Sequence, residues 1–121
     1  GALLAAAGEG RLDAVRWLLA RGAAPDIRNR FGVTPLMIAA RGGWTDVAAA
    51  LCAAGADVNA ASTDGMTPLQ QAICRGGIDA VRKLIELGAD VNRPSMGLTP
   101  LGYAKEELPE AVALLAAAGA R

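Results

Sequence analysis

Few side chains in this sequence have the types and spacing that catalysis needs. The chain contains no histidine, which removes the commonest general base and most zinc sites. Its two cysteines, Cys52 and Cys74, show no metal-site spacing and no disulfide framework. Cys74 could act as a reactive thiol, or it could fill space as a small apolar side chain. We therefore expect no catalytic residue, no metal and no cofactor.

The acidic residues are the remaining candidates for acid–base chemistry. Asp13, Asp46 and Asp79 recur every 33 residues, so they occupy one position of a repeat and do not meet in one site. A carboxylate at the start of a helix is stabilised by the helix dipole, so this row indicates helix starts. Glu106 and Glu107 could hold a cation or a basic partner, or they could lie in solvent at a helix end.

Composition and charge exclude other classes of partner. Twelve basic and twelve acidic residues leave no net charge to draw the chain to nucleic acid or to an anionic membrane. The longest apolar runs are shorter than the roughly 20 residues that span a bilayer. The sequence thus predicts no nucleic-acid binding and no membrane insertion. The low cysteine count favours a reducing, cytoplasmic setting.

Two landmarks recur in one phase and indicate the elements that position these residues. One is the tripeptide Thr-Pro-Leu and the other is the dipeptide Gly-Ala, and each returns after roughly 33 residues. An internal repeat of this length is typical of a solenoid. The tripeptide begins at Thr34, Thr67 and Thr99, and the dipeptide begins at Gly22, Gly55, Gly88 and Gly119.

Each repeat predicts two short helices and one extended loop. The first helix begins at Thr-Pro, because the hydroxyl caps free N–H groups and Pro suits the first turn. The second helix ends at the Gly of Gly-Ala, which can adopt the left-handed conformation. The polar segment that follows is expected to form a hairpin-like loop, turning for example at Asp64-Gly65. Two helices and a loop cannot enclose a core alone, so the units must stack into an all-α solenoid.

This pattern resembles the ankyrin repeat over nearly the whole chain. The resemblance implies an ankyrin-type solenoid of stacked helix-turn-helix units with hairpin-like loops, in a single domain of residues 1–121. We expect four repeats, the first truncated and the last shortened, at about 1–28, 29–61, 62–93 and 94–121. The family motif continues Thr-Pro-Leu with a His that ties its repeat to the next. Met37, Gln70 and Gly102 stand there instead, which implies a less rigid stack.

The resemblance also implies a protein–protein interaction module and no enzyme. In ankyrin proteins the loop tips and the adjacent ends of the first helices form a concave surface that binds partners. Carried over by position, these ends supply Cys74, Glu106 and Glu107 to the groove. The expected partner-binding residues are Arg28, Arg30, Phe31, Val33, Arg41, Thr63, Asp64, Met66, Arg75, Ser95, Met96 and Leu98.

Phe31 and the arginines are the most informative members of this set. Ankyrin loops commonly carry Asp or Asn at the position of Phe31, so an aromatic there could belong to an apolar interaction strip with the loop methionines. It could instead fold back on Val33. Arg28 and Arg30 could meet an acidic segment of the partner, or could lie in solvent.

The tryptophans and the chain ends leave further possibilities. Trp17 is expected in the core, whereas Trp44 could cover an edge of the stack or mark a second contact surface. The ends of the chain are partly apolar. This favours an alternative function as a scaffold or regulatory segment of a larger protein, packing on its own chain. A third alternative is a small-molecule or metal site at Cys74 and the two glutamates.

Overall fold

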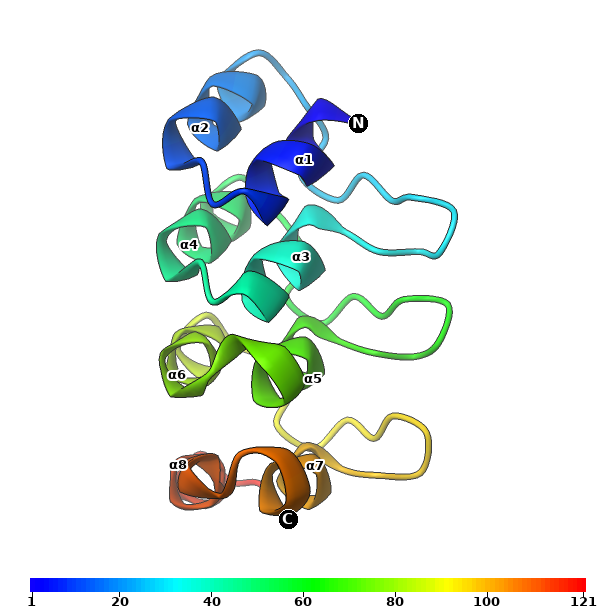
Figure 1. Cartoon of the computed structure of the whole chain (residues 1–121), viewed down its shortest axis with the longest axis vertical. Coiled ribbons are helices and arrows are strands. Elements are labelled where there is room, and N and C mark those ends of the chain that lie inside the picture. Colours follow the sequence, from blue (N-terminus) through cyan, green and yellow to red (C-terminus); the bar gives the residue numbers. More distant parts are fainter.

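Short helices stack in pairs into a single column, with the loops projecting on one side (Figure 1). The structure is a computed structural model that describes all of residues 1–121. It is all-helical, and its only bridge of β type joins Ser95 to Leu98. The first pair is α1 (Ala2–Gly8) and α2 (Leu12–Ala20), and the second is α3 (Pro35–Gly42) and α4 (Thr45–Ala53). In the third pair, α5 (Pro68–Gln71) continues directly into the π-helix η1 (Ala72–Gly76) and is followed by α6 (Ile78–Glu86). In the fourth pair, α7 (Pro100–Glu107) is followed by the short 3₁₀-helix η2 (Pro109–Ala111) and by α8 (Val112–Ala117).

The predicted helix starts at Thr-Pro are confirmed. The hydroxyl of Thr34 accepts the backbone N–H of Met37 at 3.3 Å, and the hydroxyl of Thr67 accepts that of Gln70 at the same distance. Thr99 repeats the contact with Gly102 at 3.2 Å. Each hydroxyl satisfies one N–H that has no partner inside its helix, so the chain places α3, α5 and α7 by local chemistry.

The core runs along the column and is built from small and aliphatic side chains. One alanine from each first helix is buried at the same repeat position, which allows these helices to approach closely. Aliphatic residues of the second helices, such as Val15, Leu51 and Leu84, lie against them with almost no exposure. This shared apolar burial is the main force holding successive pairs together. The buried alanines are Ala6, Ala39, Ala72 and Ala104.

A row of hydrogen bonds links successive units behind the loops. In each bond the acceptor is the side chain of an Asp or Asn that lies four residues after the Gly of Gly-Ala. The donor is a backbone N–H that lies just beyond the second helix of the following unit. These bonds fix the spacing of the units at a place where no helix packs. They are Asp26 to Asp57 N at 3.0 Å, Asn59 to Asp90 N at 2.7 Å, and Asn92 to Arg121 N at 2.9 Å.

The structure corrects the expectation for Trp17. Its side chain is 57% exposed on α2 and is stacked with the guanidinium of Arg21, 4.3 Å from the ring centre. The equivalent position in the next pair is Ala50, which faces the first pair across a hollow between α2 and α4. Nothing covers that direction at the first pair, so a residue of the type expected in the core lies on the surface.

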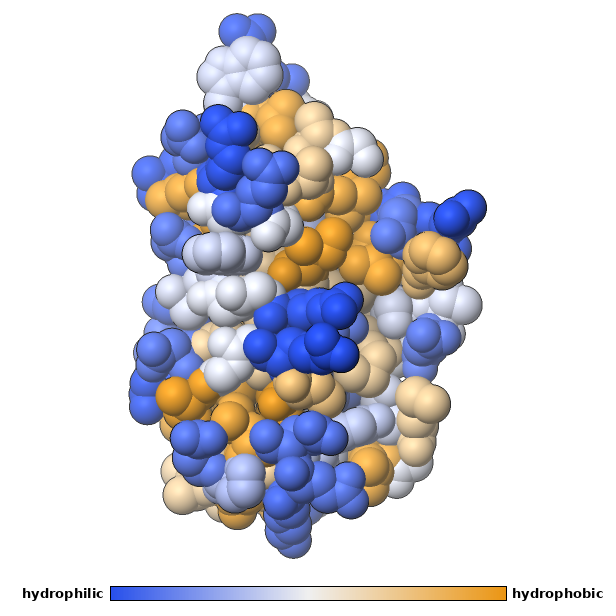
Figure 2. Space-filling model, in the orientation of Figure 1, coloured by the Kyte–Doolittle hydropathy of each residue, from blue (hydrophilic) through white to orange (hydrophobic).

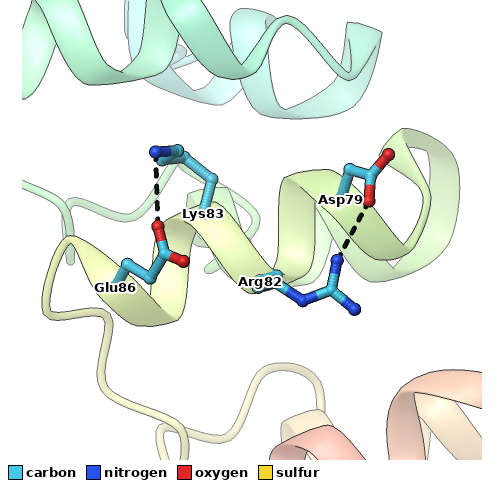
Figure 3. A network of polar contacts seen from close by, with 4 residues as sticks. All are labelled: Asp79, Arg82, Lys83 and Glu86. Carbon is cyan, nitrogen blue, oxygen red and sulfur yellow. Dashed lines mark hydrogen bonds and ion pairs between the residues drawn. The ribbon is translucent and has the colours of Figure 1, made fainter.

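Two ion pairs lie along α6 (Figure 3), Arg82 to Asp79 at 3.0 Å and Lys83 to Glu86 at 3.2 Å. The Lys83 side chain extends from α6 toward the preceding second helix, α4. All four side chains are at least partly exposed, so these pairs contribute little to stability.

No helix of the column combines the length and apolar character that a membrane crossing requires.

Candidate protein-binding surface

Three loop tips project side by side from the column, at residues 29–33, 62–66 and 95–98 (Figure 1). We call these segments the tip row. In the first, the side chain of Asn29 accepts the backbone N–H groups of Phe31 and Val33, at 2.9 and 3.1 Å. In the second, Ser62 accepts the N–H of Met66 at 3.3 Å. Polar side chains at the tip bases therefore hold turns that no helix supports.

Direct contacts also tie neighbouring tips together. The backbone N–H of Thr63 donates to the carbonyl of Phe31 at 3.0 Å. The hydroxyl of Ser95 reaches the sulfur of Met66 at 3.4 Å. The phenol of Tyr103, on α7, donates to the carbonyl of Ser95 at 2.9 Å and anchors the third tip to the helix below it. The tips consequently form a connected row.

Two arginines clamp the middle loop from opposite sides. Arg28 donates to the carbonyls of Gly32 and Ala61, both at 2.8 Å. Arg93, one residue before the equivalent position two units later, donates to the carbonyl of Asn59 at 2.7 Å. Both guanidinium groups thus donate hydrogen bonds to backbone carbonyls of the loops. Arg28, expected to contact a partner, thus has a structural role in the tip row.

The exposed side chains of the tip row are apolar and charged in alternation. Phe31 is 60% exposed and Met96 is 79% exposed, and Leu98 lies beside Met96. The guanidinium of Arg30 lies 5.1 Å from the centre of the Phe31 ring, so Phe31 is paired with a cation and is not folded away. Figure 2 shows orange and blue side chains next to each other along the edge that carries the loops. Val33 and Met66 are half-buried, and Thr63 and Asp64 are exposed.

Met96 stands in a backbone conformation that L-residues avoid. Its φ is 51°, and the next residue, Gly97, has a φ of 83°. Two consecutive positive φ values make a tight two-residue turn that is normally occupied by Asn-Gly or Gly-Gly. Met96 is the only non-glycine residue of the chain with positive φ. A large apolar side chain is therefore displayed at a site where it costs backbone strain.

Ser95 does not lie where the loop pattern suggested. It is only 4% exposed, between Met66 and Tyr103, because the third tip is one residue shorter and draws its first residue inward. Its side chain cannot contact a partner in this conformation. Tyr103, which anchors it, was not among the expected residues. Its one signal in the sequence is that it is the single tyrosine of the chain.

The ends of the first helices carry the residues that the family resemblance places in a groove beside the tip row. Arg41 and Arg75 are exposed there, at the ends of α3 and η1, and Cys74 is half-buried beside Arg75. Burial raises the pKa of the Cys74 thiol, and the nearby carboxylate of Glu107 raises that pKa further, while Arg75 opposes both. The raised pKa favours the protonated thiol over the reactive thiolate at neutral pH.

The other chemistry considered for the groove finds no support in its geometry. No group of three or more acidic, cysteine or histidine side chains comes together to hold a metal ion. Glu106 and Glu107 are exposed at the end of α7. Cys52 lies on α4 in a different unit, and both cysteines are free thiols.

The chain matches a known protein family. A family model described as ankyrin repeats, in three copies, matches residues 3–95, which is more than half of the chain. The match includes α1 to α6 and ends before α7. A search of the curated proteins found no significant match.

Proposed function

Because the chain belongs to the ankyrin-repeat family, we propose that it binds a protein partner through the tip row and the adjoining groove. Ankyrin repeats are generally protein–protein interaction modules and typically have no catalytic activity. The observation that carries the proposal is the display of Phe31 and Met96 on a connected backbone. Exposed apolar side chains held in place bind with little loss of conformational entropy.

The charges around the tip row support a partner with an acidic segment. Arg30, Arg41 and Arg75 are exposed on the tip and groove of the second and third units, with no ion pair. Arg28 is excluded from this set because it is engaged by loop carbonyls. A partner strand that places carboxylates near these guanidinium groups and an apolar side chain near Phe31 fits both features.

The balanced charge favours a protein over nucleic acid as the partner, because phosphate binding needs a net basic surface. We further propose that the chain has no enzymatic activity of its own and acts in the cytoplasm. Its two free thiols are compatible with a reducing compartment. We also propose that the fourth helix pair is a shortened repeat, since it begins with the capped Thr99-Pro100 although it lies beyond the family match.

The proposal is tested by affinity capture with three baits: the parent chain, the double variant Phe31→Asp/Met96→Asp, and Trp17→Asp. Trp17 is a matched control, because it is an aromatic residue of similar exposure that lies on α2, away from the tips. We expect the parent and Trp17→Asp to retain one partner and the double variant to lose it, with equal helicity by circular dichroism. Retention by the double variant would contradict a tip-row site.

The alternative function, a scaffold or regulatory segment that packs on its own chain, is favoured by a different observation. Trp17 leaves an apolar side chain uncovered at the end of the column, where a neighbouring segment could pack. Under this alternative, capture would depend on Trp17 and would be insensitive to the tip residues. The same three baits therefore distinguish the two functions.

A further inference from the structure

The C-terminal ends of the first helices lie one above another on the face of the column that Figure 2 shows. Each end is followed by the short turn that leads into the second helix. We call this surface the turn face and define it by Arg41 and Trp44 of the second pair, Arg75 of the third, and Glu106 and Glu107 of the fourth. All five side chains are exposed.

Trp44 is the aromatic residue of the turn face, and its ring is held in a fixed position. Its indole N–H donates to the carbonyl of Gly8 in the first pair at 3.3 Å. A Cβ on Gly10 or on Gly42 would overlap the ring, so the ring packs closely against both glycines. The side chain is nonetheless 39% exposed. Trp44 therefore covers an edge of the stack between the first two pairs, and it also presents an immobilised aromatic surface of the kind that anchors partners.

The charges of the turn face change sign along the column. Arg41 and Arg75 are positive at the ends of α3 and η1, and Glu106 and Glu107 are negative at the end of α7. Figure 2 shows hydrophilic side chains gathered over the ends of α3 and η1, and again near α7. None of these four side chains forms an ion pair. Both signs of charge are therefore available to a partner.

The positive and negative regions are close enough for one segment to reach both. The Cys74 thiol, beside Arg75 in the chain, has its pKa raised by the carboxylate of Glu107 as well as by burial, so the two regions meet between the third and fourth pairs. Successive helix layers lie roughly 10 Å apart, which gives about 20 Å from the second pair to the fourth. An extended segment of about six residues covers that length.

A segment with a single sign of charge does not fit the whole turn face. A wholly acidic segment reaching from Arg41 to α7 would place carboxylates beside Glu106 and Glu107, and like charges opposed across an interface weaken binding. A wholly basic segment would meet the same obstacle at Arg41 and Arg75. A segment that carries acidic residues in one half and basic residues in the other pairs with both regions.

We propose that the turn face selects an extended protein segment that is acidic at one end and basic at the other. Its acidic residues lie over Arg41 and Arg75, beside the ring of Trp44, and its basic residues lie over Glu106 and Glu107. The inference rests on the proposed function, since it describes the partner of that binding site and adds a basic part to the acidic segment. The change of sign fixes which way the segment lies along the column.

The test uses two labelled synthetic peptides of equal length, each with a leucine between its halves. The mixed peptide carries Asp residues in one half and Lys residues in the other, and the acidic peptide carries Asp residues in both halves. Fluorescence anisotropy at low salt measures the dissociation constant of each peptide for the parent and for charge variants. We expect the parent to bind the mixed peptide about tenfold more tightly than the acidic peptide.

Two variants give the turn face a single sign of charge. Arg41→Glu/Arg75→Glu makes it wholly acidic, so this variant should lose the mixed peptide. Glu106→Lys/Glu107→Lys makes it wholly basic, so this variant should invert the preference and bind the acidic peptide more tightly than the mixed one. The inversion is the sharper result, because loss of a buried contact or of folding would weaken both peptides together.

A control variant separates local charge from net charge. Arg16→Glu/Arg82→Glu reverses two exposed arginines on α2 and α6, away from the turn face, and changes the net charge as much as Arg41→Glu/Arg75→Glu does. It should bind both peptides as the parent does. Circular dichroism should give the parent and all three variants the same helicity, because every substituted side chain is exposed.

Four results would overturn the inference. They are a parent that binds the acidic peptide as tightly as the mixed one, a parent that binds neither up to about 1 mM, a preference that does not invert in Glu106→Lys/Glu107→Lys, and a control that loses the mixed peptide. Failure of the proposed function is seen separately, in the capture experiment with Phe31→Asp/Met96→Asp. A chain that captures its partner through the tip row but fails the peptide test keeps the function and loses the charge order.

Discussion

The side-chain amide of Gln70 links its own helix start to the loop at the end of its unit. Its Oε1 accepts the backbone N–H of Thr67 at 2.9 Å, and its Nε2 donates to the carbonyl of Arg93 at 3.0 Å. Gln70 is fully buried, and none of its polar atoms lacks a partner. The family's His stands at this position, but both bonds of Gln70 lie within the third unit, residues 62–93, so the expectation of a less rigid stack stays a prediction.

Removing this link should destabilise the chain. Gln70→Leu would leave the buried N–H of Thr67 without its side-chain acceptor and remove the donor to the carbonyl of Arg93, at a cost of about 1–3 kcal/mol in the free energy of unfolding. Gln70→His can accept from Thr67 and donate to Arg93, so it should be close to neutral. Urea unfolding followed by circular dichroism measures both. Equal loss in the two variants would show that shape, and not hydrogen bonding, is what the position requires.

The row of hydrogen bonds behind the loops should contribute at each step. Asn59→Ala removes the acceptor for the backbone N–H of Asp90 and should cost about 1 kcal/mol. Asp64→Ala is the matched control, because Asp64 is an exposed tip residue for which no side-chain hydrogen bond is formed. A control as destabilised as Asn59→Ala in urea unfolding would refute the role given to the row.

Replacing Met96 should stabilise the fold and weaken binding of the partner. Met96→Asn or Met96→Gly would place a residue that tolerates positive φ in the turn and should stabilise the chain by about 0.5–1 kcal/mol. The same variants should bind the captured partner more weakly, since an exposed apolar side chain is lost. Thermal melts and affinity measurements on one set of proteins check both directions. A variant that is less stable than the parent would show that the Met96 side chain supports the turn.

Two glycines should respond differently to a methyl group. A Cβ on Gly76 would overlap the carbonyl oxygen of Ala40, a backbone atom, so η1 would have to separate from α3. We expect Gly76→Ala to cost about 3 kcal/mol or more. Gly88 meets nothing within 4 Å, and its φ of 98° adds only backbone strain, about 1 kcal/mol. If urea unfolding ranked the two costs in the opposite order, the close approach of the second and third units would be wrong.

The Cys74 thiol should react slowly, in a way that depends on Glu107. Burial and Glu107 raise its pKa, so the reactive thiolate is scarce below the alkaline range. Glu107→Gln should lower that pKa and speed alkylation at pH 8, as followed by mass spectrometry. An unchanged rate would mean that Glu107 does not influence the thiol.

The raised pKa also predicts how stability depends on pH. A thiol whose pKa is higher in the folded chain binds its proton more tightly there, so it favours folding below the unfolded pKa of about 8.5. This contribution is lost as the pH rises through the folded pKa. The pKa of the Cys52 thiol is also raised, first by burial and then by the carboxylates of Asp26 and Asp57. Replacing both cysteines with alanine should therefore flatten the alkaline fall in the free energy of unfolding.

The sequence alone was sufficient for the all-helical repeat and for the starts of three first helices. The reason is that these signals are local. A Thr hydroxyl caps an N–H three residues away, and a Gly ends a helix at its own position, so neither depends on distant residues. The 33-residue recurrence then indicates stacking, because no single unit can bury its apolar side chains alone.

Only the tertiary structure decided which residues are exposed. Trp17 has the apolar character of a core residue, yet its side chain is exposed because no other helix pair in the structure packs against that side of α2. Ser95 resembles a tip residue, yet it is buried because a one-residue difference in loop length turns it inward. The exposure of a side chain depends on which residues of the neighbouring unit pack against it. That partner is supplied by a residue about 30 positions away, which local sequence signals do not specify.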